Sequence, residues 1–125
     1  MMSATISILV VGDDEEACMF VTQILSAKGW RTDQAWIGSK ALELARSNAY
    51  DAVVFDYRKP GMDGAEICRR IREAQPAARH VFMTGTANVE TVYQAVQAGA
   101  DRVLAKPVDP TELIQILEGQ PVVSA

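Results

Sequence analysis

ILVVGDDEEA, residues 8–17, places four apolar residues before a glycine and four consecutive carboxylates. The run Ile8–Val11 is typical of a β-strand that is buried on both faces. Two carboxylates about 4 Å apart repel each other by roughly 4 kcal/mol at an effective dielectric constant of about 20. This repulsion is offset if some acids begin a helix, facing its positive end, while others hold a metal ion. The segment therefore predicts a strand, a helix start and a candidate cation site in close succession.

Short apolar runs and helical patterns alternate along the chain. After Glu16, apolar residues recur at the spacing of an amphipathic helix, and Gly29 is typical of the position just past its end. Later helical patterns end near Pro76, Gly99 and Gly119. The expected strands are residues 8–11, 52–55, 81–83 and 103–105, with a weaker one near 32–36. The order βαβαβαβαβα predicts an α/β, doubly wound (βα)5 fold of the flavodoxin-like type, with a five-stranded parallel sheet and helices on both faces.

Length and composition narrow the function classes. A chain of 125 residues suits one domain over 1–125, with a structured core at about 6–118 and a tail at 119–125. The net charge of −4 argues against direct binding of nucleic acid. No apolar run approaches the ~20 residues of a membrane span. Cys18 and Cys68 lack metal-site spacing, so we expect both to be reduced thiols. We also expect no membrane contact and a cytoplasmic location.

Chemically active side chains stand at the ends of four expected strands. Asp13 and Asp14 follow the first strand, and Asp56 ends the third. Thr84 ends the fourth strand, and Lys106 ends the fifth. A doubly wound sheet binds its ligands at the carboxyl ends of the strands, so these side chains are expected to converge at one edge. A single strand-end Asp is usually a helix cap, but four such positions together favour a functional site.

The motifs VVFDYRKPGMDG, MTG and GADRVLAKP resemble the receiver domain of two-component response regulators, over essentially the whole chain. The resemblance implies that Asp56 accepts a phosphoryl group from a sensor histidine kinase or phosphotransfer protein. It also implies that Thr84 moves to meet the phosphoryl group and that Lys106 contacts it. The phosphorylated state would then signal to a downstream protein or a fused output domain. No separate enzyme class is implied beyond self-phosphorylation from a phosphodonor and slow autodephosphorylation.

The same resemblance implies a Mg²⁺ or Mn²⁺ site. Its ligands would be Asp13, Asp56 and the backbone carbonyl of Arg58, with Asp14 as a further candidate. Mg²⁺ prefers oxygen ligands and is commonly held by one or two carboxylates together with phosphate and water. In this family the bond corresponding to Lys106-Pro107 is often cis, which points the lysine toward the phosphoryl group.

The chain departs from the family pattern at several positions. Gly12 stands where the first of two acids is usual, although a shifted register would make Asp13 and Asp14 the pair. Loss of an acid that acts through water is expected to weaken Mg²⁺ binding by ~10–100-fold, and Gly12→Asp to restore it. Val103 replaces a common aromatic residue. Val108 and Lys59 replace residues that are often Phe and apolar.

Two other functions compete with phosphoryl acceptance. A receiver-like interaction module that is not regulated by phosphorylation would explain Gly12 and Val103, but it would not need the intact strand-end residues. A haloacid-dehalogenase-like phosphatase would need a second Asp where Arg58 stands. His80 is expected in a solvated loop, and Asp63 is expected to be a helix N-cap.

Overall fold

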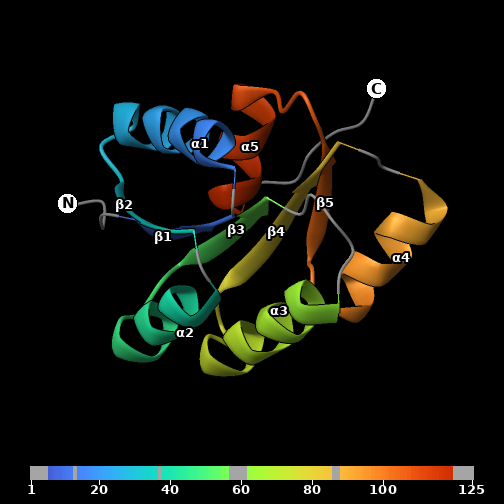
Figure 1. The fold of residues 1–125 in the computed structure, drawn as a ribbon. Coiled ribbons are helices and arrows are strands. Elements are labelled where there is room, and N and C mark those ends of the chain that lie inside the picture. The colour runs from blue at the N-terminus through green and yellow to red at the C-terminus, as the bar shows by residue number, and fades with distance from the viewer. Residues whose placement is uncertain (1–5, 13, 37, 57–61, 86–87, 120–125) are drawn as a thin grey trace.

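The computed structural model describes residues 6–12, 14–36, 38–56, 62–85 and 88–119, with only the backbone described for 62–65. Strands and helices alternate in the predicted order (Figure 1). The strands are β1 (Ser7–Val11), β2 (Arg31–Ala35), β3 (Ala52–Asp56), β4 (Arg79–Thr84) and β5 (Arg102–Ala105). The helices are α1 (Glu15–Ala27), α2 (Gly38–Ser47), α3 (Met62–Ala74), α4 (Val89–Gln97) and α5 (Pro110–Leu117).

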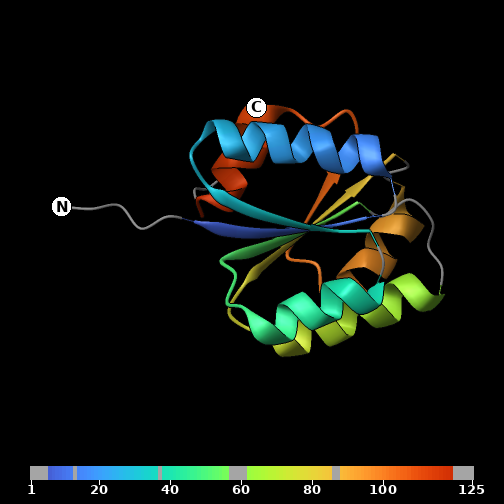
Figure 2. The ribbon, with the colours of Figure 1, turned by 60° about the vertical axis from the view of Figure 1, so that its left-hand side comes forward.

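The five strands form one parallel sheet in the order β2-β1-β3-β4-β5. Helices α1 and α5 cover one face, and α2, α3 and α4 cover the other (Figure 2). From β1 the chain continues to β2 on one side and later to β3 on the other, so the strand order reverses between β1 and β3. Doubly wound sheets bind their ligands at such a switch point. The predicted fold class is therefore confirmed.

Successive side chains of β1 point to opposite faces of the sheet, so the protein has a hydrophobic core on each face. Ile8 and Val10 join the cluster under α1 and α5, while Leu9 and Val11 join the cluster on the opposite face. All five residues of β3 are buried. A strand with both faces covered needs apolar side chains in both directions, and this requirement accounts for the uninterrupted apolar runs in the sequence.

Local signals set the helix ends. Gly29 and Gly99 follow α1 and α4 with φ of 81° and 108°, a backbone region that glycine adopts without steric cost. Asn88 and Asp109 cap α4 and α5 by accepting hydrogen bonds from Thr91 N and Thr111 N. The expectation for Asp63 is wrong, because α3 already begins at Met62 and Asp63 lies within its first turn.

His80 is a core residue of β4, not the solvated loop residue expected from the sequence. It is 1% exposed, and its ring stacks on Phe55 with 6.2 Å between ring centroids. Its Nε2 donates to the Gln75 carbonyl at 3.0 Å. Burial lowers the pKa of His80, only partly opposed by this hydrogen bond. The expectation was wrong because His80 is a polar residue directly before the apolar run 81–83. Nothing in the local sequence indicates that the strand already begins at Arg79.

The burial of His80 predicts a loss of stability in mild acid. The unfolded chain binds a proton near pH 6.5, whereas the folded chain keeps His80 neutral to lower pH, so stability falls as pH drops through the unfolded pKa. Asp101 accepts from the His80 amide. Burial alone would raise the Asp101 pKa, but this bond and Arg72 lower it overall. The stability that the Asp101 carboxylate provides is therefore lost only at a more acid pH than that at which His80 acts.

We expect the unfolding free energy of the wild type to fall by up to about 1.4 kcal/mol per pH unit below pH 6.5 because of His80. In His80→Gln this dependence should be largely absent. Urea denaturation at a series of pH values from 7.5 to about 5 measures it. Equal slopes for both proteins would mean that His80 titrates alike in the folded and unfolded states.

Candidate functional site

The register of the sheet brings three of the predicted site residues to one edge. Asp56 is the last residue of β3 and pairs with Met83, so Thr84 follows immediately on the neighbouring strand. Thr84 pairs in turn with Ala105, and its carbonyl accepts from the Lys106 amide at 2.8 Å. The carboxyl ends of β3, β4 and β5 lie at this edge (Figure 1). Asp56, Thr84 and Lys106 therefore gather as the strand-end pattern indicated.

Asp56 carries the unusual feature of the site. Its side chain is 0% exposed, and the Lys106 ammonium forms an ion pair with its Oδ1. Apart from this ion pair, no described residue donates a hydrogen bond to either Asp56 carboxylate oxygen. Burying a carboxylate without hydrogen-bond donors is costly, and buried charges are usually paired or coordinate a metal. The described residues thus leave most of the bonding capacity of this carboxylate unused.

Lys106 directly follows β5, and its side chain reaches past β4 to this carboxylate. Its side chain is 27% exposed, so the ammonium lies between the buried carboxylate and solvent. The Lys106-Pro107 peptide bond is cis, as the resemblance implied, and the side chain points to Asp56. Thr84 is buried at 4% exposure. Lys106 supplies a compact positive charge at the carboxylate.

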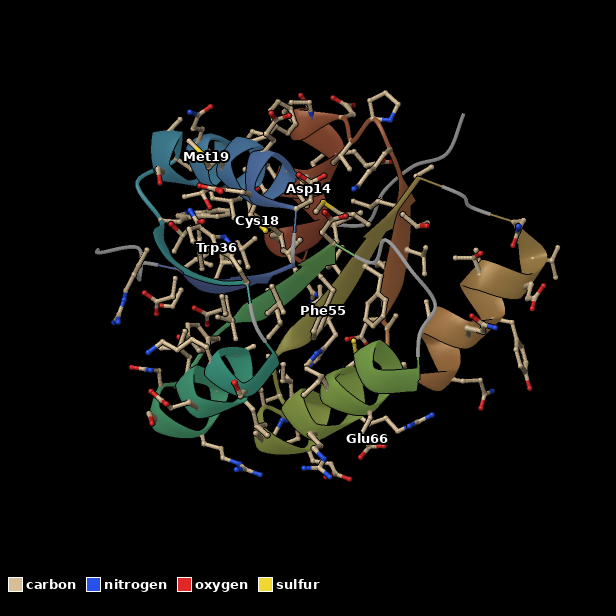
Figure 3. The ribbon with its side chains drawn as sticks, in the orientation of Figure 1. Asp14, Cys18, Met19, Trp36, Phe55 and Glu66 are labelled. Atoms are coloured by element: carbon tan, nitrogen blue, oxygen red, sulfur yellow. The ribbon has the colours of Figure 1, made fainter. Side chains whose placement is uncertain are left out.

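Three acids of the cluster after β1 belong to the start of α1, which confirms the predicted helix start. Asp14 is the N-cap of α1, and its Oδ1 accepts from the amides of Glu16 and Ala17 at 3.1 and 3.3 Å (Figure 3). Glu15 and Glu16 are exposed in the first turn, near the positive end of the helix. Asp13 and Arg58, two of the expected metal ligands, lie outside the described residues. Within the described ranges, no three His, Cys, Asp or Glu side chains form a cluster that could hold a metal ion.

The donor set at Asp56 fits a hard divalent cation. Both carboxylate oxygens are buried, and apart from the Lys106 ammonium at Oδ1 no described residue donates to them. Mg²⁺ prefers oxygen ligands of this kind. Asp14 uses one of its oxygens for capping. A role for Asp14 as a metal ligand, like the roles of Asp13 and Arg58, stays a prediction.

Sequence reasoning missed the role of Cys18. This residue is 0% exposed on the side of α1 that packs against the sheet, and its Sγ donates to the Gly12 carbonyl at 3.6 Å (Figure 3). Cys18 and Cys68 are both buried, and neither forms a disulfide bond, as expected. The position of Cys18 in the apolar stripe of α1 signalled burial, but no local pattern could signal its contact with Gly12.

Comparison with known proteins defines the class to which this fold and site belong. The family model described as the response regulator receiver domain matches residues 8–118. The chain belongs to this family. The transcriptional regulatory protein ZraR of Salmonella typhimurium is 36% identical over 118 residues, which cover 94% of this chain and 27% of ZraR. The chain thus corresponds to a minor part of that relative.

Solved relatives have the same fold. A response regulator from Burkholderia pseudomallei, solved with a phosphorylated aspartic acid, a calcium ion and citrate, is 31% identical with a TM-score of 0.80. That match covers 90% of this chain and 66% of the other. The receiver domain of a sensor histidine kinase from Pseudomonas aeruginosa, solved with magnesium in its active-site cleft, is also 31% identical with a TM-score of 0.80. It covers 93% of this chain and 97% of the other.

The ion pair at Asp56 predicts how removal of the Lys106 ammonium changes the stability of the protein. Lys106→Met leaves a buried carboxylate without a charge partner, which we expect to destabilise the metal-free protein by about 1–3 kcal/mol, less than for a fully buried pair. Asp56→Asn introduced into this variant should recover most of the loss, because the amide carries no charge. Denaturant unfolding in the presence of a chelator measures both effects.

The matched control is Lys28→Met. Lys28 pairs with Glu118 across 3.7 Å at the surface, and the loss of such a pair costs about 0–1 kcal/mol. A Lys106→Met variant no less stable than Lys28→Met would show that the ion pair with Asp56 contributes nothing to the metal-free fold.

Proposed function

We propose that this chain is a phosphoacceptor. Asp56 takes a phosphoryl group from a sensor histidine kinase or a phosphotransfer protein in a Mg²⁺-dependent step, and the phosphorylated state signals to a downstream partner. The observation that carries the proposal is the buried Asp56 carboxylate at the ligand-binding edge of the sheet, with Lys106 paired to it and Thr84 on the adjacent strand.

The chemistry requires positioning and neutralisation of charge more than covalent work by the protein. An oxygen of Asp56 forms a bond to phosphorus while the bond from phosphorus to the donor breaks, which leaves an acyl phosphate on the protein. Lys106 neutralises charge on the transferred group, and the Thr84 hydroxyl donates to one of its oxygens. A divalent cation, held in this proposal by Asp13, Asp56 and the Arg58 carbonyl, supplies further positive charge when bound.

The relatives support this assignment without naming a pathway. The Burkholderia protein contains a phosphorylated aspartic acid, and the Pseudomonas domain contains magnesium. Because this chain covers 27% of ZraR, a fused output domain or a separate downstream protein would carry the response. We expect no direct binding of nucleic acid by this domain. None of the helices in the described part of the chain has the length and apolarity to cross a bilayer.

Phosphorylation of Asp56 is the direct test. Acetyl phosphate with Mg²⁺ should add one phosphoryl group, visible by intact mass and removed by hydroxylamine, as expected for an acyl phosphate. Asp56→Asn should not be modified. Asp51→Asn is the matched control, because Asp51 lies exposed just before β3. Within the described part of the chain, its side chain accepts one hydrogen bond, from the Ser7 amide. An interaction module that is not regulated by phosphorylation would leave the wild type unmodified too.

Val103 predicts how far the phosphorylated state changes the surface. Its side chain is half-buried against the core cluster that includes Phe82, its partner on β4. Val103 is stiff at χ1 and has no ring to rotate inward when Thr84 moves. We therefore expect beryllofluoride, a phosphoryl mimic, to shift the amide signals around Asp56, Thr84 and Lys106 more than those of α4 and α5.

Sedimentation with and without beryllofluoride completes this test, and we expect no new dimer. The contrary result would be large shifts along both helices together with dimerisation through the exposed apolar residues of α4, namely Val89, Tyr93 and Val96.

A further inference from the structure

Gly12 is packed more tightly against the acceptor residue than its place in the sequence suggested. It directly follows β1, and its amide donates to the Ala35 carbonyl at 3.0 Å, which continues the pairing of β1 with β2. A Cβ added at Gly12 would lie 2.7 Å from the Asp56 Cβ and 3.2 Å from the Cys18 Sγ. Real Cβ atoms essentially never approach a heavy atom more closely than 3.0 Å. A side chain at residue 12 therefore requires movement of its neighbours.

The neighbours of Gly12 have little freedom to move. Asp56 is held in β3 between β1 and β4, and the clashing atom is its Cβ, not the far end of a flexible side chain. Cys18 is fully buried, and its Sγ, the second atom that the added Cβ would meet, donates to the Gly12 carbonyl. Protein interiors are close-packed, and forcing added atoms into them moves the backbone. The end of β3, which carries the acceptor carboxylate, would be displaced.

We propose that Gly12 is a positioning residue for Asp56. The missing side chain lets the end of β1 close against β3, and this contact holds the Asp56 carboxylate where the Lys106 ammonium reaches it. The expectation that Gly12→Asp strengthens Mg²⁺ binding considered charge alone. Since the added side chain displaces the acceptor, restoring the acid does not by itself restore metal affinity. This inference rests on the proposed function of Asp56 and concerns the geometry of the same site.

Substitution by alanine separates packing from charge. Gly12→Ala adds the clashing Cβ without a carboxylate, and we expect its phosphorylation by acetyl phosphate to slow on the order of 10–100-fold, the scale of a misplacement near 1 Å. Gly85→Ala is the matched control, because Gly85 follows Thr84 at the same edge and a Cβ there meets no described residue within 4 Å. Gly85→Ala should keep the wild-type rate.

A second substitution tests positioning directly. Cys18→Ala removes the sulfur that would lie 3.2 Å from the added Cβ, which leaves room for residue 12 to shift and relieve the contact with the Asp56 Cβ. Gly12→Ala/Cys18→Ala should therefore recover much of the lost rate, whereas a general loss of core packing would make the double variant worse. Denaturant unfolding separates a loss of rate from a loss of fold. If Gly12→Ala does not fold, the double variant carries the comparison.

Metal-free amide NMR spectra provide a readout that does not depend on phosphorylation. Gly12→Ala should shift the signals of Asp56 and Lys106, and Gly85→Ala should not. Mg²⁺ titration of Gly12→Asp should give no tighter binding than the wild type. A wild-type rate in Gly12→Ala, or about tenfold tighter Mg²⁺ binding in Gly12→Asp with unshifted Asp56 and Lys106 signals, would overturn the inference. If the wild type is not phosphorylated at all, the proposed function fails, while the metal-free spectra still decide the role of Gly12.

Discussion

The buried charge of Asp56 is the constraint on which the site depends. β3 is the central strand and is buried along its whole length, yet its last side chain is a carboxylate with no exposed surface. Such a charge persists only with a partner, and Lys106 provides it. Because β5 lies two strands from β3, the pair forms only when β3, β4 and β5 are in register. The site therefore depends on correct assembly of half of the sheet.

The other half of the sheet brings β1 and α1 to the same carboxylate. Asp14 starts α1 at the correct point by accepting the first free amides of the helix. This start directs Cys18 onto the sheet, where it contacts the Gly12 carbonyl beside Asp56. The acids that made the opening segment unusual thus have separate tasks. Asp14, Glu15 and Glu16 stabilise a helix end, and the remaining Asp13 would join Asp56 and the Arg58 carbonyl in the proposed cation site.

A glycine at residue 12, where the family resemblance implies an acid, can be interpreted in two ways. It can mark a site that no longer accepts phosphoryl groups, or a site whose geometry has adapted. The intact and spatially gathered Asp56, Thr84 and Lys106 favour the second interpretation. So does the close approach at residue 12, because the chain fills the space that a side chain would occupy with the acceptor residue itself.

The residue pattern was enough to predict the order of elements, the parallel sheet and the three strand-end residues that meet. These features follow from local periodicity and from the rule that parallel strands end at one edge. The same pattern predicted the helix ends at Gly29 and Gly99, since positive φ is a local property. The environments of His80 and Gly12 were decided only by the tertiary structure. Both depend on contacts between residues far apart in the chain: His80 with Phe55, and Gly12 with Asp56. Such contacts depend on strand register and close packing, and no local pattern of residue types records either of them.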